Sequence, residues 1–202
     1  MSVAPRAEPV HPEESRAGAD VKPFSGAPRR RCYHRRMLAP DLQVDDVTQV
    51  TVAWLRGRGL RAVLVDADDT LVPGDDGPVA PEAVAWAREV RAAGVLLAIL
   101  SNGTAERVAA LGRQLEVPAF ALAGKPFSFA FRRAVRSLGA EPATTAMIGD
   151  QLFTDVLGAR CAGLTSVLVT PLTPGRHAHT RWVRRLERWV LAGGDRARPV
   201  DR

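Results

Sequence analysis

From about residue 60 onwards, the pattern of apolar and polar positions shows two kinds of segment that alternate along the chain. Periodic apolar segments with three- and four-residue spacing predict helices, at 81–93, 104–115, 126–138 and 155–162. Short apolar runs lie between them and predict buried strands, at 61–65, 95–100, 120–122, 145–148 and 166–169. Strands that alternate with helices are typical of a parallel sheet covered on both faces. We therefore expect an α/β fold with three layers and a mostly parallel sheet.

The same pattern divides the chain into a globular body and two ends. Residues 1–36 are rich in Pro, Gly, Arg and Glu without apolar periodicity, which predicts a disordered basic tail. Residues 37–175 carry the strand and helix pattern and form the predicted domain. Residues 176–202 are predicted to form a basic amphipathic helix and a tail. One helical face there is apolar and includes Trp182 and Trp189. Such a face lies in a membrane interface or packs on the domain, and the sequence leaves both open.

The positive charge is concentrated at the two ends of the chain. Residues 1–37 carry 8 Lys/Arg against 4 Asp/Glu, and residues 171–202 carry 8 against 3, within a net charge of +6. The segment 38–170 is mildly acidic, with 12 against 15. Basic ends favour anionic surfaces such as membranes or nucleic acid, and of these two we expect a membrane surface and not nucleic acid.

The compartment can be predicted from three features of the sequence. Only two cysteines occur, and residues 1–30 lack the apolar centre of a signal peptide. No run reaches the roughly 18 apolar residues of a membrane span. We expect a cytoplasmic protein, with peripheral membrane contact through the C-terminal segment as the alternative.

Two carboxylates, Asp66 and Asp68, follow the strand predicted at 61–65. Because strand side chains alternate, both should leave from one face and point into the crevice beyond the strand's carboxyl end. Open α/β sheets bind their ligands there. A buried carboxylate pair is costly unless a cation or a reaction uses it. We therefore expect a functional site, and a hairpin or cap turn is the structural alternative.

Three more polar motifs occur at the ends of later strand and helix units, and the third includes a carboxylate five residues further on. In order they are Ser101-Asn102, Lys125, and Gly149-Asp150 with Asp155. Together with Asp66, Asp68 and Thr70, they resemble the four motifs of the haloacid dehalogenase (HAD) superfamily of phosphatases. Each motif alone is a weak signal, but four in this order are a strong one. The resemblance implies a Rossmann-like HAD fold.

The resemblance also implies a role for each carboxylate of the first and last motifs. Asp66 would be the nucleophile that forms an aspartyl-phosphate. Asp68 would be the general acid for the leaving group and then the base toward water. Mg²⁺ would be held by the carboxylates of Asp66 and Asp150 and the backbone carbonyl of Asp68. Asp155 would orient the site, or would be a plain helix N-cap.

The remaining motif residues would bind the phosphate or support the site. Lys125 would neutralise phosphate charge and assist catalysis. The Ser101 hydroxyl and the Asn102 backbone N–H would bind phosphate oxygens at a helix start. Thr70 would brace the turn after the first strand.

The spacing of the motifs leaves no room for a cap domain, which many HAD enzymes insert to enclose small substrates. About 30 residues separate the first two motifs, and 23 lie between Ser101 and Lys125. We expect a capless member with an open cleft, which suits a large or surface-bound substrate.

Longer stretches resemble the YqeG family of subfamily IIIA phosphatases over about residues 37–190. They are Met37-Leu-Ala-Pro-Asp-Leu-Gln-Val, Leu60-Arg-Ala-Val-Leu-Val-Asp, Gly149-Asp-Gln-Leu-Phe-Thr-Asp-Val-Leu-Gly-Ala-Arg and Thr170-Pro-Leu. Asp69 departs from the pattern, since relatives commonly have Asn there. That family is related to phosphatidylglycerophosphate phosphatases, which implies a lipid headgroup phosphate as substrate.

Three other functions compete with this interpretation. The first is a phosphatase for a small soluble metabolite or a phosphoprotein. The second is a phospho-accepting receiver domain, which would need an aspartate where this chain has Ser101. The third is a catalytically silent module of the same fold, against which the intact acidic motifs argue. The oligomeric state cannot be predicted from the sequence.

Overall fold

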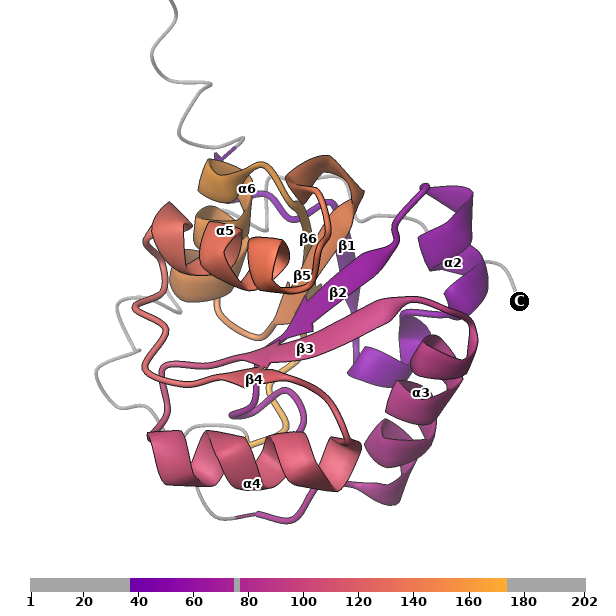
Figure 1. Cartoon of the computed structure of the whole chain (residues 1–202), viewed down its shortest axis with the longest axis vertical. Coiled ribbons are helices and arrows are strands. Elements are labelled where there is room, and N and C mark those ends of the chain that lie inside the picture. Colours follow the sequence, from indigo (N-terminus) through magenta and orange to yellow (C-terminus); the bar gives the residue numbers. More distant parts are fainter. Residues whose placement is uncertain (1–36, 75–76, 174–202) are drawn as a thin grey trace, which may run out of the picture.

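Six parallel strands form the central sheet of the molecule (Figure 1). The computed structural model describes residues 37–74 and 77–173. The sheet order is β1-β6-β5-β2-β3-β4, and every neighbouring pair is parallel. The strands are β1 (Leu42–Val44), β2 (Ala62–Val65), β3 (Leu96–Leu100), β4 (Ala119–Phe120), β5 (Thr145–Gly149) and β6 (Thr165–Val169). The parallel α/β prediction is thus confirmed, and the predicted tails lie outside the described residues.

Helices connect the strands and cover both faces of the sheet. The α-helices are α2 (Val52–Gly57), α3 (Pro81–Ala92), α4 (Ala105–Leu115), α5 (Ser128–Ser137) and α6 (Leu157–Ala162). Short 3-10 turns lie at Val47–Gln49 and Pro142–Thr144, and a π-helical turn, η3 (Leu152–Val156), leads into α6. Figure 1 shows α3 and α4 on one side of the sheet and α5 and α6 on the other.

The alternation of strand side chains divides the hydrophobic core into two layers. Val63 and Val65 of β2 belong to the layer beneath α3 and α4, together with buried side chains such as Trp86. Leu64, between them in sequence, belongs to the layer beneath α5 and α6 with Phe131. All residues of β2 are buried, as expected for a central parallel strand.

The edge strand β1 was not predicted from the sequence, because three residues carry too little apolar pattern. A polar cluster attaches it to the body. The Asp41 carboxylate accepts hydrogen bonds from the Ser166 N–H and hydroxyl, both at 2.9 Å, and pairs with Arg160 at 2.9 Å. Burial tends to raise the pKa of Asp41, but the hydrogen bonds from Ser166 and the nearby Arg160 hold it below its ordinary value.

The topology brings the motif residues to one edge of the sheet. From β2 the chain proceeds to β3 and β4 on one side, and then crosses to β5 on the other side. The carboxyl ends of β2 and β5 therefore lie at the topological switch point, where α/β folds bind ligands. The described residues between β2 and β3 add only α3 and a loop, and those between β3 and β4 add only α4.

Candidate active site

A buried lysine between two carboxylates is at the centre of the site. Lys125 follows β4, and its Nζ lies 2.8 Å from Asp66 Oδ1 and 2.7 Å from Asp155 Oδ1. All three side chains are at most 6% exposed. Asp66 directly follows β2, and its N–H extends the strand ladder by bonding the Ile148 carbonyl at 2.9 Å. Residues from three separate parts of the chain thus form one buried ionic cluster.

Burial and charge act against each other in this cluster. Burial alone would lower the pKa of Lys125, but the carboxylates of Asp155 and Asp66 raise it above its ordinary value. Burial raises the pKa of Asp66. The positive charge of Lys125 lowers this pKa and the negative charge of Asp155 raises it further, and the net result is an increase. Lys125 therefore stays a cation, and it offsets one of the two carboxylate charges beside it.

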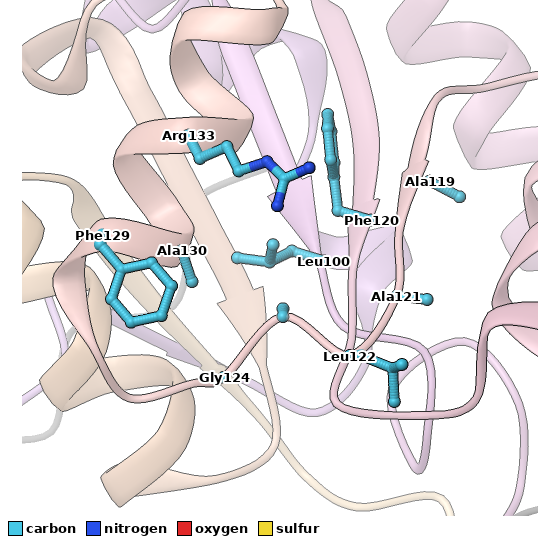
Figure 2. Close-up of a pocket in the computed structure, with 10 residues that line it drawn as sticks. Leu100, Ala119, Phe120, Ala121, Leu122, Gly124, Phe129, Ala130 and Arg133 are labelled. Carbon is cyan, nitrogen blue, oxygen red and sulfur yellow. The ribbon is translucent and has the colours of Figure 1, made fainter.

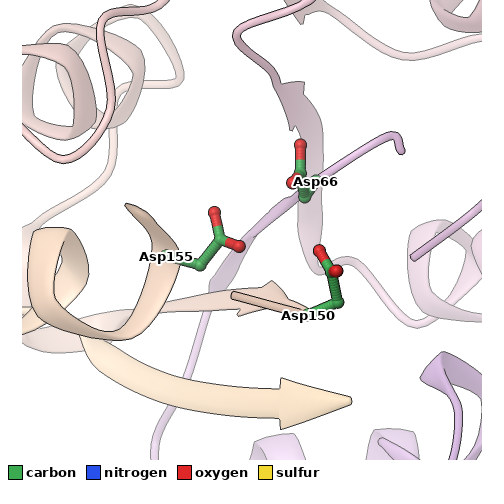
Figure 3. Close-up of side chains that lie close together, drawn as sticks. All are labelled: Asp66, Asp150 and Asp155. Carbon is green, nitrogen blue, oxygen red and sulfur yellow. The ribbon is translucent and has the colours of Figure 1, made fainter. Parts of the chain in front are cut away.

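A third carboxylate, Asp150, completes an acidic group at the end of β5. One carboxylate oxygen each of Asp66, Asp150 and Asp155 lies within 4.8 Å of the others. Figure 3 shows these side chains converging from separate elements. Asp150 is 9% exposed, and burial together with the nearby carboxylates of Asp155, Asp66 and Asp69 raises its pKa to about 8.

The donor set of this group fits a hard divalent cation. Asp150 Oδ1 is buried and has no hydrogen-bond partner within the described parts of the chain. A buried oxygen in that state costs free energy unless a proton or a metal ion takes its charge. Clustered carboxylate oxygens are the ligands that Mg²⁺ and Ca²⁺ prefer. Asp155 belongs to this group, although the sequence suggested only a supporting role for it.

The position of Asp155 depends on the glycine that ends β5. A Cβ on Gly149 would overlap the Asp155 carboxylate, so only glycine lets that carboxylate approach the strand. Asp155 Oδ2 also accepts a hydrogen bond from the Gln151 N–H at 3.1 Å. The alternative interpretation was that Asp155 is a helix N-cap. The structure instead places Asp155 inside the π-helical turn.

Asp68 points to a different partner from Asp66. Its carboxylate forms an ion pair with Arg107 of α4, whose second guanidinium nitrogen donates to the Gly74 carbonyl at 2.9 Å. The predicted shared face requires strand geometry to continue, but β2 ends at Val65. The two side chains of the Asp68–Arg107 pair are about a quarter exposed, 27% and 23%. The pair therefore lies at the rim of the site.

The motif after β3 supports its neighbours. Ser101 is buried, and its hydroxyl accepts a hydrogen bond from the Gly103 N–H at 3.0 Å. The Asn102 side chain makes two hydrogen bonds to the backbone of Lys125, accepting from its N–H at 2.9 Å and donating to its carbonyl at 3.1 Å. A Cβ built on Gly103 would lie 3.5 Å from Asp68 Oδ2, so this loop and Asp68 are close neighbours.

The turn after Asp68 is fixed mainly through Asp69 and backbone hydrogen bonds. Asp69 has a φ of 56°, and its Oδ1 accepts from the N–H groups of Gly74 and Thr173 at 3.0 and 3.2 Å. Its charge also contributes to the raised pKa of Asp150. The Thr70 N–H donates to the Ala67 carbonyl at 3.4 Å. The Thr70 hydroxyl is buried and has no hydrogen-bond partner in the described segments.

Sequence reasoning missed two features of this site. Arg107 was not among the predicted site residues, and only the tertiary structure brings it to Asp68. The Asn102 side chain was also overlooked, because its partner Lys125 is 23 positions away. The one available signal was that both residues follow Ser101 closely at the start of a helix, where site residues of α/β folds gather.

Comparisons with known proteins agree with the motifs. A family model described as HAD-hydrolase-like matches residues 122–182. "Probable phosphatase YqeG" of Bacillus subtilis is 33% identical over 158 residues, which cover 78% of this chain and 92% of that protein. A phosphoserine phosphatase of Thermus thermophilus is 38% identical over 105 residues, 46% of this chain and 41% of that protein.

A solved structure shows a weaker similarity. The cobalt-bound deoxy-D-mannose-octulosonate 8-phosphate phosphatase of Haemophilus influenzae aligns with 67% of this chain and 89% of its own, at 17% identity and a TM-score of 0.49. The relation to the Bacillus protein is closer and spans nearly its whole length. It confirms the resemblance seen in the motifs: this chain belongs to the YqeG family of HAD-type phosphatases.

Proposed function

We propose that this protein hydrolyses phosphomonoesters in two displacements, with Asp66 as nucleophile and Mg²⁺ as its metal. The observation that carries this proposal is the buried cluster in which Lys125 lies between Asp66 and Asp155 while Asp150 keeps an unpartnered oxygen. Such a cluster is costly for folding alone. It suits a site that receives a cation and a phosphate.

In the first displacement, a carboxylate oxygen of Asp66 attacks phosphorus and the bond to the leaving oxygen breaks. Asp68 must be protonated at this point, and it donates that proton to the leaving oxygen, so the product leaves as an alcohol. Lys125 stabilises the added negative charge on the phosphoryl oxygens. The Ser101 hydroxyl and the Asn102 N–H would hold those oxygens during transfer, as donors near the start of α4.

In the second displacement, water attacks the phosphorus of the aspartyl-phosphate. Asp68, now a carboxylate, takes a proton from the water. The bond between phosphorus and the Asp66 oxygen breaks, which releases phosphate and restores the carboxylate. Asp68 needs access to both the leaving oxygen and the water, and its partly exposed position at the rim supports this role.

The carboxylates of Asp66 and Asp150 and the carbonyl of Asp68 would hold Mg²⁺, with Asp155 close enough to orient them. When bound, the cation offsets carboxylate charge that would otherwise repel a phosphate dianion. Asp69 adds to that charge and so would strengthen the attraction for the cation.

The substrate class we favour is a lipid headgroup phosphate, as in phosphatidylglycerophosphate. The family relation and the short connections between motifs, which leave the cleft without a cap among the described residues, support this class. No helix in residues 37–74 and 77–173 has the length and apolarity to cross a bilayer.

Phosphate release from phosphatidylglycerophosphate in mixed micelles tests this function. We expect release that needs Mg²⁺, stops with EDTA and is lost in Asp66→Asn. Release from an aryl phosphate only, still dependent on Asp66, would keep the mechanism and replace the lipid with a soluble metabolite or a phosphoprotein. No release from either substrate would favour the silent module.

A further inference from the structure

Three large apolar side chains are exposed on either side of Lys125. Leu122 is 70% exposed, Phe127 is 66% and Phe129 is 62%, the three highest values among the large hydrophobic residues of the described chain. The rings of Phe127 and Phe129 stack, with centroids 6.1 Å apart. Single exposed apolar residues are common on soluble proteins, whereas a group of this kind marks an interaction surface.

A basic stripe continues from this apolar group along α5. Arg132, Arg133 and Arg136 are exposed and lie three, four and seven positions after Phe129, so they share its side of the helix. None of the three makes an ion pair with a residue in the described ranges. From Val117 to Ala140 the sequence contains no Asp or Glu. All charged side chains of this segment are therefore positive.

A pocket of ≈ 260 Å³ lies within the same surface, between α5 and the segment that follows β4. Leu100, Phe120 and Ala130 supply apolar walls, and Arg133 is its charged lining residue. Figure 2 shows the Arg133 guanidinium reaching over the pocket toward Phe120, with Phe129 on one flank and Leu122 on the other. An anionic group beside an apolar chain matches this pairing of charge and apolar wall.

The surface is continuous with the proposed active site through the chain itself. Gly124 lines the pocket, and the next residue, Lys125, extends to Asp66. The Asn102 side chain fixes the backbone of Lys125 through two hydrogen bonds. A partner that rests on Leu122 and Phe127 would thus contact the residues that flank Lys125 in the sequence.

We propose that Leu122, Phe127 and Phe129, with Arg132, Arg133 and Arg136, form a docking surface for an anionic lipid bilayer. The apolar side chains enter the interface, and the arginines contact headgroup phosphates. Every charged side chain of residues 117–140 is basic, which is the charge complementarity that an anionic bilayer surface requires. Binding is independent of hydrolysis, whereas its use in presenting substrate rests on the proposed function.

The test measures partitioning of the full chain onto vesicles of phosphatidylcholine with and without phosphatidylglycerol. We expect binding to the anionic vesicles only. Replacing Arg132, Arg133 and Arg136 with Gln should weaken it by about 100-fold, since each arginine near an anionic surface contributes roughly fivefold. The double variant Phe127→Ser/Phe129→Ser should lose about tenfold or more.

A matched control separates this surface from the basic ends of the chain. Arg61, Arg88 and Arg113 are also exposed, and replacing all three with Gln removes the same charge elsewhere. We expect less than about a threefold loss for that variant, because salt screens distant charges. Phe127→Trp/Phe129→Trp should keep full binding, and Asp66→Asn should bind like the native chain.

Several results would overturn the proposal. Equal losses from the two arginine triples would assign binding to net charge or to the chain ends. Unchanged binding in the phenylalanine double variant would remove the apolar contact. If sedimentation shows a dimer that this variant dissociates while vesicle binding persists, the surface joins two copies of the chain. Loss of hydrolysis with intact vesicle binding would instead count against the proposed function alone.

Discussion

The buried ionic cluster of the site and its partly exposed ion pair differ in their environment. Lys125, Asp66 and Asp155 are almost fully buried, so their charges act in a low dielectric and their positions are fixed by packing. The Asp68–Arg107 pair is about a quarter exposed and is attached to a turn and to the start of α4. A nucleophile gains from a fixed position, whereas a proton donor must reach both product and water. The difference supports the assignment of Asp66 as nucleophile and Asp68 as acid.

The largest expected effect is on the nucleophile. Asp66→Asn keeps the volume of the side chain but removes the attacking oxygen, so turnover should fall by at least about 10³-fold. Phosphate release under Mg²⁺ saturation measures it, and thermal unfolding serves as the folding control. Activity within tenfold of the native chain would exclude Asp66 as nucleophile.

The second prediction concerns the buried cation. Lys125→Met leaves Asp66 and Asp155 buried without their partner, and we expect the free energy of unfolding to fall by about 3–5 kcal/mol. Adding Asp155→Asn to this variant removes one uncompensated charge and should recover part of the loss. Denaturant titration of the metal-free proteins measures both variants. Additive losses in the double variant would show that the two residues are not coupled.

The third prediction tests whether Arg107 positions the proton donor. Arg107→Ala should lower turnover of an alkyl phosphate by about 10–100-fold, the usual contribution of general acid catalysis or less. An aryl phosphate with a leaving group that needs no proton should be affected by less than about threefold. Arg107→Lys should recover part of the alkyl activity. Equal losses on both substrates would mean that Arg107 supports the fold and not the acid.

The motif residues of this site could be predicted from the sequence better than the residues that pair with them. The motif residues could be read from the sequence, because each follows an apolar strand and the topology brings strand ends together. The residues that pair with these motif residues could not be predicted. Arg107 contacts Asp68 across 39 positions, and the Asn102 side chain contacts Lys125 across 23. The shared face expected for Asp66 and Asp68 stays a prediction, since β2 ends before both residues and their carboxylates pair with different cations. Local patterns predict elements and their ends, whereas side-chain pairing depends on packing.

The fourth prediction follows from the raised pKa of Asp150. In the metal-free protein this pKa is about 8, above the ordinary value near 4, so the folded form keeps a proton that the unfolded chain has released. The free energy of unfolding should therefore fall as pH rises from about 4 to about 8. In the proposed metal site Mg²⁺ would replace the proton, so it should raise Tm by a few degrees more at the alkaline end.

Calorimetry with and without Mg²⁺ at the two ends of that pH range measures this dependence. Asp150→Asn is the control, and it should reduce the pH slope to the part that the raised pKa of Asp66 contributes and remove most of the Mg²⁺ shift. A Mg²⁺ shift that is equal at both pH values, or that persists in the variant, would contradict the metal site.

The smallest expected effect lies far from the site, at the edge strand. Asp41→Asn weakens the bonds to Ser166 and Arg160 and should cost about 1 kcal/mol of stability near neutral pH. The pKa of Asp41 is lowered by folding, so its contribution should disappear as pH falls below about 4. Denaturant titration at neutral and acidic pH measures this difference, and an equal loss at both would contradict it. Turnover should not change.

The central claim is that Asp66 carries the phosphoryl group between the two displacements. Acid quenching of the protein during turnover of an aryl phosphate, followed by mass spectrometry of its peptides, tests this claim directly. We predict one phosphoryl group on the peptide that contains Asp66, absent in Asp66→Asn and formed before steady-state phosphate release. Turnover with no phosphorylated peptide at any time, or with the group on another residue, would contradict it.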